Sequence, residues 1–293
     1  MGQILLGLIG NSIDKSSAPF LHKMLGEVTH LNVDYRLNDP GDSSQIAFEN
    51  TLEKIRSTGY CGSNITFPFK QLALNYADIV DVSARSVGAT NTLVFKDSKI
   101  VAFNSDYTGF ISAYRSKLKD EPAGTVLMLG AGGVGRAVAY GLFQLGATEL
   151  LVFDLDPQRA AGLVSSLGES GYNARSINRS DLPQAALKAE GIINCTPVGH
   201  YATPGLPIAP ELIGSQRWAF DAVYVPIDTQ FLKLAHSKGL ELVSGFDLFF
   251  HQGIDAFESF TGIKVNTDIA LSRYFREFPV ETDLFAWSIQ ESK

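Results

Sequence analysis

The chain has 293 residues, of which 45% are hydrophobic and 19% charged, the composition of a globular protein with room for two ordinary domains. Its formal net charge of −7 argues against a nucleic-acid partner, because phosphate binding requires a basic face. No apolar run approaches the roughly 20 residues that span a bilayer, and residues 1–6 do not read as a signal peptide. The two cysteines, Cys61 and Cys195, lie far apart, so neither a disulfide framework nor a metal site is expected. A cytoplasmic protein is the default expectation.

The first hundred residues alternate between strand-like and helix-like segments. In chain order we expect a strand over 4–9, a helix over 16–28, a strand over 33–37, a helix over 43–57 and a strand over 60–65. This rhythm predicts a mostly parallel sheet with crossover helices. A hairpin is expected to follow, with strands over 91–95 and 100–103.

A second alternating region follows a long helix and the polar stretch 117–124. Here we expect strands over 125–129, 149–153, 191–194, 218–222 and 240–243, and helices over 134–145, from Pro157 onward, over 246–260 and over 267–278. The sequence therefore predicts an α/β protein of two domains. Residues 1–106 would form a substrate-binding and catalytic domain, to which helices within 246–293 return. Residues 107–245 would form a doubly wound, Rossmann-type dinucleotide-binding domain, with ligands in the cleft between the two.

A glycine-rich turn connects the strand over 125–129 to the helix that follows it. The turn has the pattern Gly-x-Gly-x-x-Gly and consists of Gly130, Ala131, Gly132, Gly133, Val134 and Gly135. Between a strand and a helix, this pattern is typical of a dinucleotide-binding loop. The first glycine allows the tight turn, the second lets the backbone approach the pyrophosphate, and the third lets helix and strand pack closely. The alternative is a glycine-rich turn that binds no ligand.

Asp154 ends the next strand, nineteen positions after Gly135. An acidic side chain at this place accepts hydrogen bonds from the ribose hydroxyls of NAD and repels the 2′-phosphate of NADP, so NAD is the expected cofactor and NADP is disfavoured. The other role open to Asp154 is to cap the helix that begins at Pro157, but Asp156 fits that role better. Arg159 either stacks on the adenine or reaches a 2′-phosphate, and we favour stacking.

Polar side chains also follow the strands of the first domain. They occur in segments 64–70, 91–92 and 104–109. Ligands of open α/β sheets gather at the carboxyl ends of strands. The lysine, carboxylate, amides and hydroxyl of these segments suit a small polyhydroxylated acid and a hydride transfer coupled to proton transfer.

With these motifs the chain resembles the shikimate/quinate dehydrogenase family over nearly its whole length. The resemblance is carried by Gly10-Asn11-Ser12-Ile13 with Ser16 and Pro19, segment 64–70, Gly88-Ala89-Thr90-Asn91-Thr92, Asn104-Ser105-Asp106, the glycine loop, segments 194–199 and 221–226, and His251-Gln252-Gly253. It implies an oxidoreductase that interconverts shikimate and 3-dehydroshikimate, with quinate as a second substrate. A homodimer is compatible with the sequence but is not indicated by it.

The resemblance also implies roles for single residues. Lys70 and Asp106 would form the catalytic pair beside the hydroxyl that is oxidised. The implied substrate contacts are Asn64, Thr66, Asn91 and Gln252 for hydroxyls, and Ser16 and Tyr224 for the carboxylate. Further implied cofactor contacts are Thr196, Val223 and Gly245. A lysine in a partly desolvated cleft beside a carboxylate can take up a proton as hydride leaves and return it in the reverse reaction. The alternative for Lys70 and Asp106 is a structural ion pair between the domains.

The chain departs from the family pattern at a few positions. Ala18 stands where many members have a second hydroxyl for the substrate carboxylate, two positions after Ser16. His200 stands where methionine is frequent near the nicotinamide. Segment 154–156 resembles the NAD-dependent quinate/shikimate branch. Ala18 leaves open a dehydrogenase for another hydroxy acid, and an NAD-binding regulator with little catalysis is a further alternative, against which the intact Lys70 and Asp106 argue.

Overall fold

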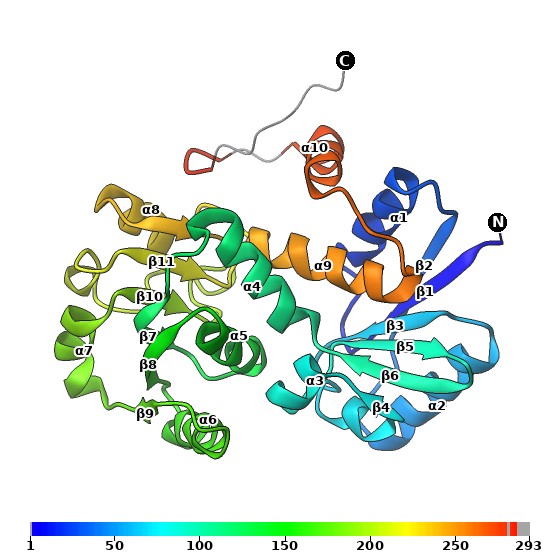
Figure 1. The fold of residues 1–293 in the computed structure, drawn as a ribbon, viewed down its shortest axis with the longest axis horizontal. Coiled ribbons are helices and arrows are strands. Elements are labelled where there is room, and N and C mark those ends of the chain that lie inside the picture. Colours follow the sequence, from blue (N-terminus) through cyan, green and yellow to red (C-terminus); the bar gives the residue numbers. More distant parts are fainter. Residues whose placement is uncertain (1, 280–281, 286–293) are drawn as a thin grey trace. The chain divides into compact units, whose positions relative to one another are not determined.

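The computed structural model describes residues 2–279 and 282–285, and the rest of the expected carboxyl-terminal region lies outside the described residues. The chain divides into two compact units (Figure 1). The described residues of the first unit are 2–105 and 252–279, and those of the second are 106–251 and 282–285. Two helices continue from one unit into the other, α4 (Ser105–Leu118) and α9 (Gly245–Thr261). No helix of the described residues is both long and apolar enough to cross a membrane.

A six-stranded mixed sheet forms the centre of the first unit. Its strands lie in the order β2 (Val33–Asn38), β1 (Ile4–Ile9), β3 (Gly62–Ile65), β5 (Thr92–Lys96), β6 (Lys99–Phe103) and β4 (Ile79–Val80). The pairings β1–β2, β1–β3 and β4–β6 are parallel, whereas β3–β5 and β5–β6 are antiparallel. The sheet is thus mostly parallel, as predicted, and the expected hairpin is present.

Helices cover both faces of this sheet because side chains alternate along each strand. On one face, Ile9 packs in a cluster with Phe48 and Leu52 of α2 (Gln45–Ser57). On the other face, Leu6 and Leu8 pack with Phe260 of α9. Helices α1 (Ala18–Val28) and α10 (Thr267–Glu277) contact each other, and α3 (Val82–Val87) contacts β6.

The second unit contains a six-stranded parallel sheet. Its strands lie in the order β12 (Glu241–Val243), β11 (Trp218–Asp221), β10 (Gly191–Asn194), β7 (Gly124–Leu129), β8 (Ala147–Phe153) and β9 (Ala174–Ser176). From β7 the chain proceeds outward through β8 and β9, then returns to the other side of β7 for β10, β11 and β12. This is the doubly wound arrangement that the sequence predicted, and its strand order reverses between β7 and β10, where ligands of such sheets bind.

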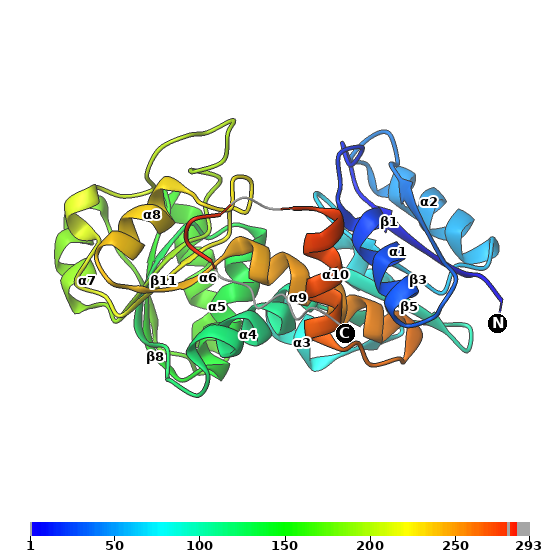
Figure 2. The ribbon, with the colours of Figure 1, turned by 90° about the horizontal axis from the view of Figure 1, so that it is seen from above.

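The helices of the second unit lie on both faces of its sheet, as Figure 2 shows. Helices α7 (Leu182–Lys188) and α8 (Gln230–Ser237) pack on one apolar face. On the other face, Phe110 and Tyr114 of α4 contact the rings of Phe220 and Trp218. Helix α5 (Gly133–Gln144) also lies against α4, and its neighbour α6 (Pro157–Glu169) is joined to it by hydrogen bonds at Ser166. Helices thus cover the two faces of the sheet, and loops follow the carboxyl ends of β7, β8, β10 and β11.

Candidate active site

The glycine loop leaves β7 and enters α5 with the geometry that its sequence requires. Gly130 has a φ of +94°, and a Cβ there would lie 2.9 Å from the carbonyl carbon of Cys195. A Cβ on Gly135 would lie 2.6 Å from the carbonyl oxygen of Gly130, so helix and strand approach closely at this point. Gly132, the N-cap of α5, has open space on its Cβ side. The loop therefore exposes backbone N–H groups at a helix N-terminus, which is a suitable place for a pyrophosphate.

Asp154 follows β8, and its carboxylate joins two backbone turns. Its Oδ2 accepts a hydrogen bond from the Ala131 N–H at 2.7 Å, and its Oδ1 accepts one from the Asp156 N–H at 2.9 Å. Asp156 is the N-cap of α6 and accepts from the Gln158 N–H at 3.0 Å, which confirms the prediction that Asp156 is the cap. Asp154 thus joins the glycine loop to the turn before α6 and is not itself the cap of that helix.

A cavity of about 680 Å³ lies beside these two turns and is formed by residues of the second unit. Its lining includes Gly132, Asp154, Arg159, Arg179 and Thr196. The Arg159 Nε lies 3.5 Å from the Asp156 carboxylate, and the Arg179 guanidinium lies 5.9 Å from the centre of the Phe153 ring. Arg179 was not identified from the sequence, because it follows β9 and is far from the glycine motif. The volume is that of a small-molecule site.

A buried carboxylate organises the loops that follow β10 and β11. Asp221 has no exposed surface, and its Oδ1 accepts hydrogen bonds from Asn194 Nδ2 at 2.8 Å and the Val223 N–H at 3.0 Å. Its Oδ2 accepts from the Thr229 hydroxyl at 2.6 Å. Asn194 in turn accepts from the Thr196 N–H and hydroxyl at 3.0 and 2.7 Å. Burial raises the pKa of Asp221 to about 7, against the opposing effect of these hydrogen bonds. Thr196 and Val223, both expected to contact cofactor, are therefore held by one network.

In the first unit, three amides expected to contact substrate are joined by hydrogen bonds. Asn64 Nδ2, at the end of β3, donates to the Asn91 carbonyl oxygen and to Thr92 Oγ1, each at 3.2 Å. Asn91 Oδ1 accepts from the Ser105 N–H at 2.7 Å, and the Ser105 hydroxyl donates to Gln252 Oε1 at 3.3 Å. The structure brings Asn64, Asn91 and Gln252 together, although Gln252 is 147 residues from Ser105 in sequence. Thr92 and Ser105 hold these amides by hydrogen bonds, a role that was not foreseen from the sequence.

The other residues expected in the first unit lie at the ends of its strands and at the start of α1. Thr66 donates its N–H to the Ile9 carbonyl oxygen at 2.9 Å, and the carbonyl oxygen of Lys70 accepts from the Thr90 N–H at 2.8 Å. The Ser16 hydroxyl oxygen accepts from the Ala18 N–H at 3.3 Å. Ser16 therefore stabilises the first turn of α1, and its hydroxyl proton remains for a ligand.

The second unit carries the remaining expected residues. Asp106 is buried in the first turn of α4. The ring of Tyr224 is stacked on that of Phe249, with centres 5.1 Å apart, and burial raises the pKa of its phenol. Gly245 begins α9, and a Cβ there would lie 2.7 Å from the Val223 carbonyl oxygen. This close approach requires glycine.

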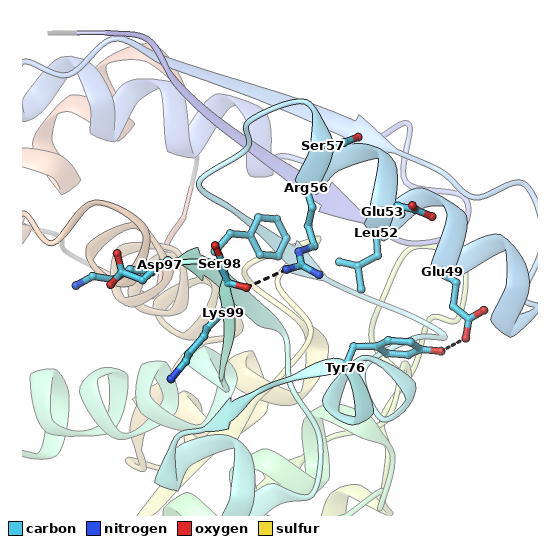
Figure 3. Close-up of a pocket in the computed structure, with 11 residues that line it drawn as sticks. Glu49, Leu52, Glu53, Arg56, Ser57, Tyr76, Asp97, Ser98 and Lys99 are labelled. Atoms are coloured by element: carbon cyan, nitrogen blue, oxygen red, sulfur yellow. Dashed lines mark hydrogen bonds between the residues drawn. The ribbon is translucent and has the colours of Figure 1, made fainter.

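A second cavity of about 660 Å³ lies in the first unit between α2, the 3₁₀ turn Leu72–Tyr76 and the β5–β6 hairpin (Figure 3). Two pairs of its polar groups are hydrogen-bonded: Tyr76 bonds to Glu49, and Arg56 donates to the Ser98 carbonyl oxygen at 3.1 Å. It contains none of the expected site residues. Among the residues that the structure describes, no three His, Cys, Asp or Glu side chains gather as a metal centre would require.

Comparison with known proteins supports a common fold and chemistry. Residues 8–93 match the family model described as "Shikimate dehydrogenase substrate binding domain". The chain is 38% identical over 280 residues to the shikimate dehydrogenase (NADP(+)) of Pseudarthrobacter chlorophenolicus, covering 92% of this chain and 94% of that protein. It is 37% identical over 270 residues to the quinate/shikimate dehydrogenase (NAD(+)) of Corynebacterium efficiens, covering 90% and 95%.

Solved structures agree with this similarity. The quinate dehydrogenase from Corynebacterium glutamicum in complex with NAD superposes with a TM-score of 0.88 at 33% identity, over 94% of this chain and 100% of that one. The shikimate 5-dehydrogenase from Thermus thermophilus in complex with NADP(H) and shikimate gives a TM-score of 0.80 at 30% identity, over 93% and 99%. The relatives thus differ in the cofactor that they are named for.

Proposed function

Because this chain belongs to the shikimate/quinate dehydrogenase family of NAD(P)-dependent oxidoreductases, we propose that it interconverts shikimate and 3-dehydroshikimate with NAD as its preferred cofactor. Quinate is proposed as a second substrate, oxidised to 3-dehydroquinate. The observation that carries the cofactor assignment is the Asp154 carboxylate, fixed at the carboxyl end of β8 beside the glycine loop.

The position of Asp154 favours a ribose with two free hydroxyls. Each carboxylate oxygen accepts one backbone hydrogen bond and keeps a lone pair for a ribose hydroxyl. A charge-assisted hydrogen bond of this kind contributes about 1.5–3 kcal/mol. A 2′-phosphate would be repelled by this carboxylate and by Asp156, which lines the same cavity. Arg159 and Arg179 line it too, and we assign them to the adenine, on whose face a guanidinium can stack.

The bound nicotinamide ring would supply the acceptor for the hydride that leaves the carbinol carbon. The protein's own part is to hold the acid and to move one proton. The amides of Asn64, Asn91 and Gln252 bind the hydroxyls that do not react, and Ser16 and Tyr224 bind the carboxylate. The pair of Lys70 and Asp106 takes up the proton of the reacting hydroxyl as its C–O bond becomes a carbonyl, and returns it in reduction. These roles follow from the family resemblance and from the chemistry of the side chains.

A steady-state assay tests the proposal directly. The kcat/KM values for shikimate and quinate are measured with NAD and with NADP, on protein whose folding is checked by circular dichroism. We expect turnover of at least one acid. We also expect kcat/KM to be at least about tenfold higher with NAD than with NADP, because NADP would lose one charge-assisted hydrogen bond to Asp154. Absence of turnover with both acids contradicts the substrate assignment. A higher kcat/KM with NADP contradicts the cofactor assignment alone.

A second candidate function is the oxidation of another small hydroxy acid. Ala18 favours it, since this residue begins α1 two positions after Ser16 and offers no side-chain donor to a carboxylate. A substrate with a different arrangement of carboxylate and hydroxyls would not need that donor. The same assay separates the two candidates. If another hydroxy acid is the substrate, kcat/KM will be low for both shikimate and quinate.

A further inference from the structure

We propose that Tyr35 is a positioning residue for the substrate: its phenol hydroxyl fixes the Asn64 amide so that Asn64 can only accept a hydrogen bond from a substrate hydroxyl. The inference rests on the proposed function, in which Asn64 contacts such a hydroxyl. It adds a residue that neither touches substrate nor belongs to any of the motifs discussed above.

Hydrogen bonds fix the orientation of the Asn64 side-chain amide. Tyr35 Oη donates to Asn64 Oδ1 at 2.9 Å. The amide nitrogen has two hydrogens, and these go to the Asn91 carbonyl oxygen and to Thr92 Oγ1, each at 3.2 Å. Both donors are therefore used within the protein, so the amide oxygen is the only group of Asn64 left to contact a substrate hydroxyl. A flipped amide would place its oxygen against the Asn91 carbonyl oxygen, which has no proton to donate, and this is unfavourable.

Tyr35 reaches Asn64 across β1, the strand between them. Tyr35 on β2 pairs with Leu6 of β1, whereas Asn64 on β3 pairs with Leu8 of the same strand. The phenol ring thus spans β1, and it is 3% exposed. It packs in the apolar cluster that contains Leu6, Leu8 and Phe260. A side chain so enclosed cannot turn its hydroxyl elsewhere without displacing core residues.

The imidazole ring of His22, on α1, packs against the phenol ring of Tyr35. The two rings are stacked, with centres 4.6 Å apart and planes 14° apart. Burial lowers the pKa of His22 to about 3, against the opposing effect of a side-chain hydrogen bond to Asn64, so its imidazole is neutral against the phenol. Burial also raises the pKa of Tyr35 well above its ordinary value of 10.0. The Tyr35 hydroxyl consequently keeps its proton over the working pH range and remains a donor to Asn64.

The chain offers a matched control for the loss of this hydroxyl. Tyr60 is also buried in the first unit, and its hydroxyl donates to Oδ1 of an asparagine, Asn38, at 3.5 Å. Asn38 has no expected role in substrate binding. Tyr35→Phe and Tyr60→Phe therefore remove the same group from two buried rings of the first unit, and only the first removes support from a proposed substrate contact.

The test compares kcat, KM for shikimate and KM for NAD in the wild type, Tyr35→Phe, Tyr60→Phe, Asn64→Ala and the double variant Tyr35→Phe/Asn64→Ala. We expect Tyr35→Phe to lower kcat/KM for shikimate about tenfold, the effect of one lost hydrogen bond, with KM for NAD unchanged. Tyr60→Phe should change neither kcat/KM for shikimate nor KM for NAD by more than about twofold. In the Asn64→Ala background, Tyr35→Phe should cause no further loss, because the two residues act through one contact.

Either of two kinetic results overturns the inference: equal behaviour of Tyr35→Phe and Tyr60→Phe, or losses that add in the double variant. If Tyr35→Phe does not fold, the wild type is assayed with shikimate analogues in which each non-reacting hydroxyl is replaced in turn by fluorine or hydrogen. Fluorine cannot donate, so at the position that Asn64 recognises we expect both analogues to be equally poor. A fluoro analogue better than the deoxy analogue at every position overturns the inference. A wild type that turns over neither shikimate nor quinate instead contradicts the proposed function, and this inference with it.

Discussion

The buried carboxylate of Asp221 makes the stability of the second unit depend on pH. Its pKa rises from the ordinary 3.8 to about 7, chiefly because burial penalises the charged form. Between these two values the folded state binds one proton more than the unfolded state. The protonated Asp221 carboxyl therefore stabilises the folded state at low pH, and this stabilisation is lost as pH rises toward 7. One pKa unit corresponds to about 1.4 kcal/mol, so the two units between pH 5 and the folded pKa correspond to about 3 kcal/mol.

Asp221→Asn should abolish this dependence. The amide oxygen can still accept from Asn194 and Val223, and the amide nitrogen can donate to the Thr229 hydroxyl that now donates to Asp221. The shape is unchanged, and no charge is buried at any pH. Between pH 5 and 8.5, we expect the variant to gain about 3 kcal/mol in free energy of unfolding relative to the wild type.

Urea denaturation at several pH values measures the effect, with tryptophan fluorescence as the probe. Trp218 lies on β11 with Asp221 and is fully buried, and a Trp287→Phe background makes the signal specific to it. Asp156→Asn is the control, because Asp156 is exposed and asparagine also caps helices well. The control should follow the wild type. Parallel pH dependence in the wild type and Asp221→Asn would refute the reasoning.

Further predictions concern the proposed site. Asp154→Ala should weaken NAD binding by about ten- to a hundredfold in calorimetry, through loss of a charge-assisted hydrogen bond; unchanged affinity would remove Asp154 from the cofactor site. Lys70→Met should lower kcat by about 10²- to 10⁴-fold, the usual effect of a lost acid–base group, with the Kd for NAD unchanged; a wild-type kcat would favour the structural ion pair. Ala18→Ser should change KM for shikimate by less than about threefold if the remaining carboxylate contacts suffice. A fall of tenfold or more, the value of one added charge-assisted hydrogen bond, would indicate a site adapted to another acid.

The longer elements were predictable because their apolar periodicity is local. The strand expected over 4–9 is Ile4–Ile9, and the strand expected over 191–194 is Gly191–Asn194. Short elements such as α3, α7 and β9 were not identified from the sequence, since three to seven residues do not show a period. Their form depends on the sheet against which they pack.

The site shows the same division between local and distant information. The approach of Gly135 to Gly130 and the Asp156 cap depend on neighbours within a few residues, and both have the geometry that the sequence indicates. The side chains that support the amides proposed to bind substrate come instead from distant parts of the sequence. Tyr35 and Asn64 are 29 positions apart, and Ser105 and Gln252 are 147 apart. Strand order and register decide the contact between Tyr35 and Asn64, whereas the placement of α4 and α9 decides that between Ser105 and Gln252. None of these is encoded in a short motif.

Asp154 illustrates why cofactor preference is not a matter of one charge. Its carboxylate accepts from the N–H of Ala131, so it also fixes the turn that presents the glycine loop. Replacing it with a neutral residue removes the repulsion of a 2′-phosphate, but it also releases Ala131 and the turn before α6. Such a variant loses affinity for the part of the cofactor that NAD and NADP share. If the proposed preference for NAD holds, a change to NADP requires both a new basic contact for the phosphate and a new acceptor for the Ala131 N–H.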